Sequence, residues 1–269
     1  MKHVRAPLIG FDTVPAIEAA LAGTKRPTKR FPVRYLRYWF VRNALAELQR
    51  ELGRPLRVLE VGIGKGKMLG FMGGPSAGNG RYALPACIER WDALSAGADQ
   101  ETLERYSYSS FHQVDLNESF DLPAHDYDAI VVLHVLEHLL DPDLVLRRLL
   151  DGLAGGGLLV GGSPTMPSIL ARFEERRLRR KYAGRMHDLS AHKHLAVITP
   201  RRIRTVADRE GISVEFVTGA FFLRASSNPL ENHRWWLRAN LAWGAFFPAL
   251  GGEVYFALRK GSRRTTRQG

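Results

Sequence analysis

The chain of 269 residues contains a single cysteine, Cys87. One thiol excludes an intrachain disulfide framework and a cysteine-rich zinc site, and it is typical of a protein from a reducing compartment. The first residues also lack the long apolar stretch of a cleavable signal peptide. We therefore expect a cytoplasmic protein, and peripheral contact with the inner face of the membrane stays open.

Acidic residues are scarce relative to basic ones, with 27 Asp and Glu against 39 Lys and Arg, so the net charge is +12. The surplus lies in residues 1–42, 172–185 and 259–269, which contribute +7, +5 and +5 and leave about −5 for the remainder. This distribution indicates a mildly acidic core with basic additions. Such additions could face RNA, an anionic membrane or a phosphorylated substrate, or they could simply be solvated.

Short apolar runs alternate with helical patterns along the first two thirds of the chain. The predicted strands are 56–61, 83–89, 111–115, 128–133 and 157–161, and the predicted helices are 33–52, 65–72, 91–106 and 142–153. Strands alternating with helices predict parallel βαβ units in a doubly wound sheet. Later in the chain we expect helices at 168–182 and 200–210 and strands at 212–217 and 253–259, the last two pairing in antiparallel fashion.

The most informative segment runs from Val58 to Gly66. Val58-Leu59-Glu60-Val61 is typical of a buried parallel strand, and glycine follows at Gly62, Gly64 and Gly66. Glycine lets the backbone turn tightly and approach a ligand closely. The dinucleotide spacing fails because its third glycine would fall on Lys67 or Leu69, and the phosphate-loop spacing fails as well. The loop therefore favours a nucleotide-type ligand without bridging phosphates.

Further motifs follow in a fixed order along residues 56–217. They are Glu60-Val61-Gly62-Ile63-Gly64-Lys65-Gly66, Glu89, Val114-Asp115-Leu116, the run 127–139, Asp141-Pro142 and the run 153–157. In this arrangement the chain resembles the class I S-adenosylmethionine-dependent methyltransferases, in their small-molecule (type 11/23-like) branch. The resemblance implies a Rossmann-like, mostly parallel seven-stranded sheet with an antiparallel last strand, an N-terminal helix and inserted helical lid segments.

The resemblance divides the chain into three parts. Residues 1–55 would form an N-terminal arm and helix, 56–162 the cofactor-binding core, and 163–269 a substrate-covering segment that also completes the sheet. It also implies S-adenosylmethionine as the cofactor, bound by Glu60, Gly62, Gly64, Gly66, Glu89, Asp115, Leu116, His134 and Val135. In that set Glu89 would bind the ribose hydroxyls and Asp115 the adenine. Trp91 could pack on the adenine face or simply between helix and sheet.

Histidines provide the candidate bases. The resemblance directs His138 towards the transferred methyl group, where it could deprotonate a hydroxyl, although it could merely pack at the sheet edge. His187 and His194 could orient or deprotonate the acceptor, or lie in a partly exposed loop. His134 to His138 also matches the H-x-x-E-H pattern of one zinc peptidase class. We expect strand, turn and helix start there instead, and we assign no metal site.

The run 235–247 has a wide apolar arc at helical spacing and is too short to span a bilayer. It could be an interfacial helix, a lid over an apolar substrate, or a surface that packs on the sheet or on a second subunit of a homodimer. The sequence as a whole predicts methyl transfer to a small-molecule acceptor at a hydroxyl oxygen, the acceptor being phosphorylated, glycan-linked or lipid-linked. An RNA methyltransferase and a non-catalytic cofactor-binding module are the alternatives.

Overall fold

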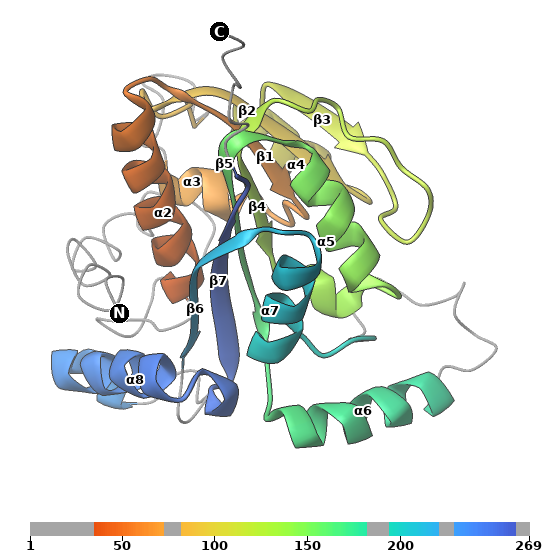
Figure 1. Ribbon diagram of the computed structural model, residues 1–269. Helices are drawn as coiled ribbons and strands as arrows, with labels where there is room; N and C mark the ends of the chain where they lie inside the picture. The colour runs from red at the N-terminus through yellow and green to blue at the C-terminus, as the bar shows by residue number, and fades with distance from the viewer. Residues whose placement is uncertain (1–34, 73–81, 182–193, 221–228, 262–269) are drawn as a thin grey trace, which may run out of the picture.

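A computed structural model describes residues 35–72, 82–181, 194–220 and 229–261 (Figure 1). Its centre is a seven-stranded sheet with the order β3-β2-β1-β4-β5-β7-β6. Strand β7 is antiparallel to both of its neighbours, and the other pairings are parallel. This arrangement confirms the predicted fold class. The strands are β1 (Leu56–Val61), β2 (Ile88–Ser95), β3 (Ser110–Gln113), β4 (Tyr127–Leu133), β5 (Leu153–Pro164), β6 (Ser213–Ala220) and β7 (Glu253–Arg259).

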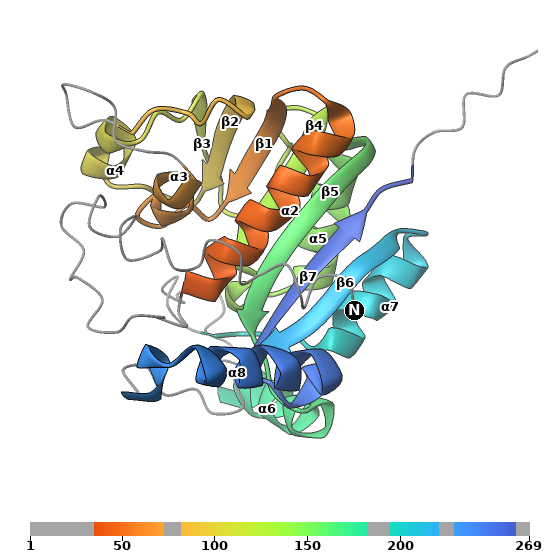
Figure 2. The same cartoon turned by 90° about the vertical axis from the view of Figure 1, so that its left-hand side faces the viewer.

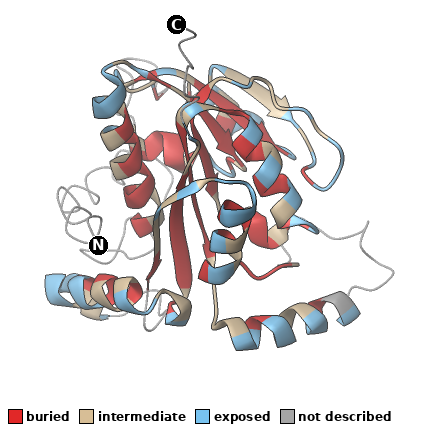
Figure 3. Cartoon of the chain, in the orientation of Figure 1, coloured by how far each residue is buried: buried red, intermediate tan, exposed pale blue. Residues whose placement is uncertain are grey.

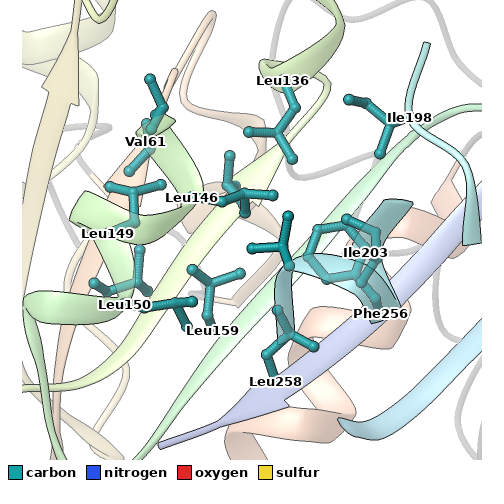
Figure 4. Close-up of a cluster of buried hydrophobic side chains, with 14 of the residues drawn as sticks. Val61, Leu136, Leu146, Leu149, Leu150, Leu159, Ile198, Ile203, Phe256 and Leu258 are labelled. Carbon is teal, nitrogen blue, oxygen red and sulfur yellow. The ribbon is translucent and has the colours of Figure 1, made fainter. Parts of the chain in front are cut away.

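Helices cover both faces of the sheet (Figure 2). Helices α2 (Leu36–Leu52) and α3 (Lys67–Met72) pack on one face, in a cluster that includes Val41, Leu45 and Leu69. Helices α5 (Pro142–Asp151) and α7 (Pro200–Arg209) pack on the other face, where Leu146 and Ile203 meet Leu159 and Phe256 (Figure 4). The central strands are buried from both sides, as Figure 3 shows. Apolar burial on both faces is expected of a mostly parallel sheet.

The remaining elements lie mainly at the carboxyl edge, the end of the sheet where its parallel strands finish. They are α4 (Gln100–Arg105), η4 (Leu136–His138), α6 (Ser168–Lys181), η6 (Pro229–Asn232), α8 (Arg234–Phe246) and η7 (Pro248–Leu250). Figure 1 shows α6 and α8 lying across the same end of the molecule. Helix α8 packs directly on β6, because a Cβ at Gly244 would lie only 1.7 Å from the Gly219 carbonyl oxygen. No described helix is both long and apolar enough to cross a membrane.

The position of the second strand differs from the prediction. The sequence pattern placed it at 83–89 with a helix over 91–106, whereas β2 spans Ile88–Ser95 and α4 only Gln100–Arg105. Residues 88–95 include charged side chains, which are unusual in a buried strand, so the sequence pattern did not indicate a strand here. The partners that allow these side chains to be buried are distant in sequence. Asp92 is buried and accepts hydrogen bonds from Ser110 (2.7 Å) and Tyr127 (2.8 Å).

Candidate cofactor and active site

The glycine loop leaves β1 with positive φ angles of 74° at Gly62, 52° at Gly64 and 65° at Gly66. These values favour glycine, because a side chain is strained in this region. A Cβ at Gly62 would lie 2.2 Å from Val135 Cγ2, whereas one at Gly64 would meet no atom within 4 Å. The loop therefore packs on the turn after β4 at one point and presents an open, Cβ-free backbone at the next.

Glu60 lies directly below this loop and is fully enclosed. Its carboxylate accepts hydrogen bonds from Trp91 Nε1 at 2.9 Å and from the Tyr108 hydroxyl at 3.4 Å. Burial raises the pKa of Glu60 to about 8, against the opposing effect of both donors. Trp91 is itself 0% exposed, so its ring has no face open to a ligand. The interpretation that Trp91 stacks on adenine is therefore wrong, and the alternative, packing between the sheet and its covering helices, is what the structure shows.

Two carboxylates reach the carboxyl edge beside the glycine loop. Asp115 follows β3 and is exposed, and the preceding residue, Val114, donates its backbone N–H to the Ser95 carbonyl at the end of β2. Leu116 is buried beneath it. Asp99 caps the N-terminus of α4, and the hydrogen bond from Thr102, together with the charge of Lys65 in the glycine loop, lowers the pKa of Asp99.

Glu89 does not join this group. The prediction that it ends the second strand is wrong, because it is the second residue of β2 and lies at the opposite, amino edge. There its charge acts on Arg54, in the turn that leads into β1. The first acidic residue after the carboxyl end of β2 is Asp99, which the sequence pattern did not single out.

His134 directly follows β4 and has a strained backbone conformation. With φ of 55°, it is the one non-glycine residue with positive φ in the described part of the chain. Its Nδ1 lies 3.3 Å from Glu137 Oε1, and its Nε2 lies 3.7 Å from Glu253 Oε1. Burial by itself lowers the pKa of His134, but the two carboxylates outweigh this effect and raise it above its ordinary value. Lying between two buried carboxylates, His134 holds the turn after β4 in place.

His138 and His194 meet at the end of this turn. Their rings form an edge-to-face pair with centroids 5.0 Å apart. Residues Leu195 and Ala196 donate their backbone N–H groups to the Glu137 carbonyl oxygen, at 2.7 and 3.1 Å, and so fasten the segment that carries His194. His187 lies outside the described residues. The predicted strand and turn are present, since His134 follows β4 and His138 ends the short helix η4.

An open glycine backbone after β1, carboxylates after β2 and β3, and a turn of β4 that touches the loop together define a class I methyltransferase fold of the kind that binds S-adenosylmethionine. A family described as "Methyltransferase domain" matches residues 34–215, and the chain belongs to this family. A search of the curated proteins gave no significant match.

Solved structures resemble this chain at low sequence identity. The CurJ carbon methyltransferase is 17% identical with a TM-score of 0.53, over 96% of this chain, which spans 61% of that protein. The N-methyltransferase NodS from Bradyrhizobium japonicum WM9, in complex with S-adenosyl-L-homocysteine, is 17% identical over 93% of this chain and 98% of its own, with a TM-score of 0.48. The plantazolicin methyltransferase BpumL, also in complex with S-adenosyl-L-homocysteine, is 15% identical over 96% and 95%, with a TM-score of 0.49.

The residues at the carboxyl edge fit the cofactor. The backbone at Gly64 opens onto free space that any side chain would enter, and Asp99 and Asp115 are exposed carboxylates able to accept hydrogen bonds from hydroxyl or amino groups. Three contributors to this edge escaped sequence reasoning: Glu137, Ser163 and Glu253. Glu137 stands within a recognised pattern and could have been found. Glu253 opens the last strand, and only the antiparallel insertion of β7 brings it to His134.

Proposed function

We propose that this methyltransferase acts on a hydroxyl oxygen of a small-molecule acceptor and that His138 accepts the hydroxyl proton. The observation that carries the proposal is the position of the His138–His194 pair. It follows the turn in which Val135 would collide with a Cβ on Gly62, so the imidazoles and the glycine loop border one region. The side chain of His138 is 24% exposed and so reaches solvent.

Methyl transfer to a hydroxyl requires that the methyl donor and the acceptor oxygen be held in position and that one group accept the hydroxyl proton. When bound, the cofactor supplies a methyl group already activated by its positively charged sulfur. During transfer the acceptor oxygen would form the new C–O bond, the electron pair of the S–C bond would stay with sulfur, and the hydroxyl proton would pass to an imidazole nitrogen of His138. The protein holds the reactants in line and excludes water, which supplies much of the rate.

Charge in a cleft between α6 and α7 supports an anionic acceptor. The cleft has a volume of about 360 Å³, and its wall contains four arginines and two carboxylates: Arg172, Arg201, Arg202, Arg209, Asp143 and Glu175. Arg202 is paired with Asp143 and with Glu175 (2.8 Å), so the positive surplus comes from the other arginines. The segment 194–199 connects this cleft to the histidine pair, because it carries His194 as well as the cleft residues Val197 and Thr199. A phosphate on the acceptor would match this surplus.

Exposed apolar side chains support an acceptor linked to lipid in an anionic membrane. On α6, Ile169, Leu170 and Phe173 are 74%, 56% and 64% exposed, and the same helix carries exposed arginines. Near α8, Trp235, Phe246 and Phe247 are 57%, 69% and 48% exposed. Apolar side chains surrounded by arginine favour contact with anionic headgroups. Both helices lie across one end of the molecule (Figure 1), so one flat surface could engage both.

Methyl transfer from isotope-labelled S-adenosylmethionine tests the proposal. We expect label to appear as methyl ether on phosphorylated or lipid-linked acceptors carrying free hydroxyls, and His138→Ala to lose most of the transfer while retaining cofactor binding. Label on nitrogen or carbon would contradict the choice of oxygen, and full activity in His138→Ala would remove this histidine as the base.

A further inference from the structure

A second grouping at the carboxyl edge has the composition of a metal site. Glu137, His138 and His194 each offer one ligand atom, and these atoms all lie within 4.8 Å of one another. They come from η4 and from the segment before α7, which are far apart in sequence. Among the residues that the structure describes, no other group of three His, Cys, Asp or Glu side chains meets this condition.

The state of Glu137 gives an independent reason to expect a ligand. This side chain is 1% exposed, and its Oε1 accepts no hydrogen bond of normal geometry, although His134 Nδ1 lies 3.3 Å and His138 Nε2 4.0 Å from it. Its other oxygen, Oε2, accepts a hydrogen bond from the Ser163 hydroxyl at 3.0 Å. A buried carboxylate oxygen without a donor is costly unless a cation or a donor completes it. An oxygen of the Glu137 carboxylate lies within 4.8 Å of a ring nitrogen of both His138 and His194, so a cation held between these three side chains would complete the carboxylate.

We propose that Glu137, His138 and His194 bind one divalent transition-metal ion, with Zn²⁺ as the best match. Two imidazoles and one carboxylate form a nitrogen–oxygen set that suits Zn²⁺, and three protein ligands leave a coordination position for water or an acceptor oxygen. Ligand atoms around one zinc ion lie roughly 3–4 Å apart, so small side-chain rotations from the present positions suffice.

The surroundings of the site are organised as a metal site requires. A ligating carboxylate is normally held by further hydrogen-bonding groups, which fix its orientation. Ser163 holds Oε2 of Glu137, and His134 approaches Oε1 at 3.3 Å while Glu253 lies on the far side of His134. His134 is thus a positioning residue for the carboxylate. The backbone bonds from Leu195 and Ala196 to Glu137 keep His194 close without the ion.

This inference deepens the proposed function, because an acceptor hydroxyl on the open position would lose its proton more readily. With the ion bound, His138 would be a ligand in place of the proton acceptor named in the proposed function, and the hydroxyl proton would pass to solvent; methyl transfer to a hydroxyl oxygen stays as proposed. Metal binding itself needs neither cofactor nor acceptor, so it can be measured separately from methyl transfer.

The test is titration of the metal-free full-length protein with Zn²⁺ by calorimetry, and with Co²⁺ by visible absorption. We expect one ion per chain with micromolar or tighter affinity, and a rise in the melting temperature with added Zn²⁺. His194→Ala and His194→Asn should weaken binding about 10- to 100-fold, as should His138→Ala. His125→Ala, in the exposed loop before β4, is the matched control and should bind as the parent does.

Absence of saturable Zn²⁺ binding up to millimolar concentration, in protein shown to be folded by circular dichroism, would overturn the inference. Binding that persists unchanged in both the His138 and the His194 variants would overturn it as well. A protein that binds S-adenosyl-L-homocysteine but no metal loses only this inference. A protein that binds metal in the expected way but transfers no methyl group to any hydroxyl loses only the proposed function.

Discussion

The indole Nε1 of Trp91 donates a 2.9 Å hydrogen bond to the buried carboxylate of Glu60, and so joins the second strand to the residue below the glycine loop. The pKa of Glu60 is nevertheless about 8, because burial outweighs this bond and that from Tyr108. Near neutral pH the group therefore holds a proton that it lacks in the unfolded chain.

This shift predicts pH-dependent stability. A carboxyl whose folded pKa lies above its unfolded value contributes its full stability at low pH and loses it as pH rises from about 4.5 to about 8. Glu60→Gln stays neutral and should remove this dependence, so the variant should gain roughly 2–4 kcal/mol relative to the parent between pH 5 and pH 8. Urea unfolding at both pH values measures the difference. An identical pH dependence in both proteins would contradict the assigned protonation.

Because the backbone at Gly64 is open, we expect a side chain there to reduce cofactor affinity strongly while reducing folding stability only slightly. Gly64→Ala meets no protein atom within 4 Å, so its cost to folding comes from φ alone, about 1–2 kcal/mol. The added methyl should nonetheless weaken S-adenosyl-L-homocysteine binding at least tenfold. Gly53→Ala is the matched control, since Gly53 also has positive φ and open space but ends α2 at the far edge. Equal affinities in the two variants would move the cofactor away from this loop.

Replacing the carboxylates at the carboxyl edge should weaken cofactor binding, whereas replacing Glu89 should not. Asp99→Ala and Asp115→Ala should each weaken cofactor binding about tenfold, equal to one good hydrogen bond to a charged acceptor. Glu89→Ala, at the amino edge, should leave the affinity unchanged. Calorimetry on the three variants decides the matter, and a loss confined to Glu89→Ala would restore the role that the sequence pattern gave it.

Contact with an anionic membrane should depend on α6. The parent should float with vesicles that contain phosphatidylglycerol. A smaller fraction should float at high salt, because salt screens the attraction between exposed arginines and the anionic headgroups. Phe173→Asp should reduce this binding several-fold. Leu52→Asp alters a side chain that is 41% exposed at the opposite end of the sheet and should bind as the parent does. Equal flotation of both variants would argue against this surface.

Local patterns were sufficient to predict much of the fold. Strand β1 and strand β7 lie where the apolar runs placed them, and helix α7 begins at Pro200 after the capping Thr199. These features depend on neighbouring residues, so the sequence displays them directly. The glycine loop could be found for the same reason, since its spacing is itself the signal.

Pairings between distant residues were not visible in the sequence. The strand 88–95 contains Glu89, Arg90 and Asp92, and only its contacts with Ser110 and Tyr127 make Asp92 acceptable in the interior. The same holds for the pair His134–Glu253, which requires β7 to insert between β5 and β6. Local periodicity carries no information on such partners. Ser163 and Glu253, which contact Glu137 and His134, were therefore recognised as site residues only from the three-dimensional structure.

The most direct test of the account is calorimetric titration of the full-length protein with S-adenosyl-L-homocysteine, with Gly64→Ala measured alongside. We expect one molecule bound per chain with a dissociation constant of micromolar order, and clear weakening in the variant. Absence of saturable binding up to millimolar concentration, or equal affinity in parent and variant, would contradict a cofactor site on the Gly62–Gly66 loop.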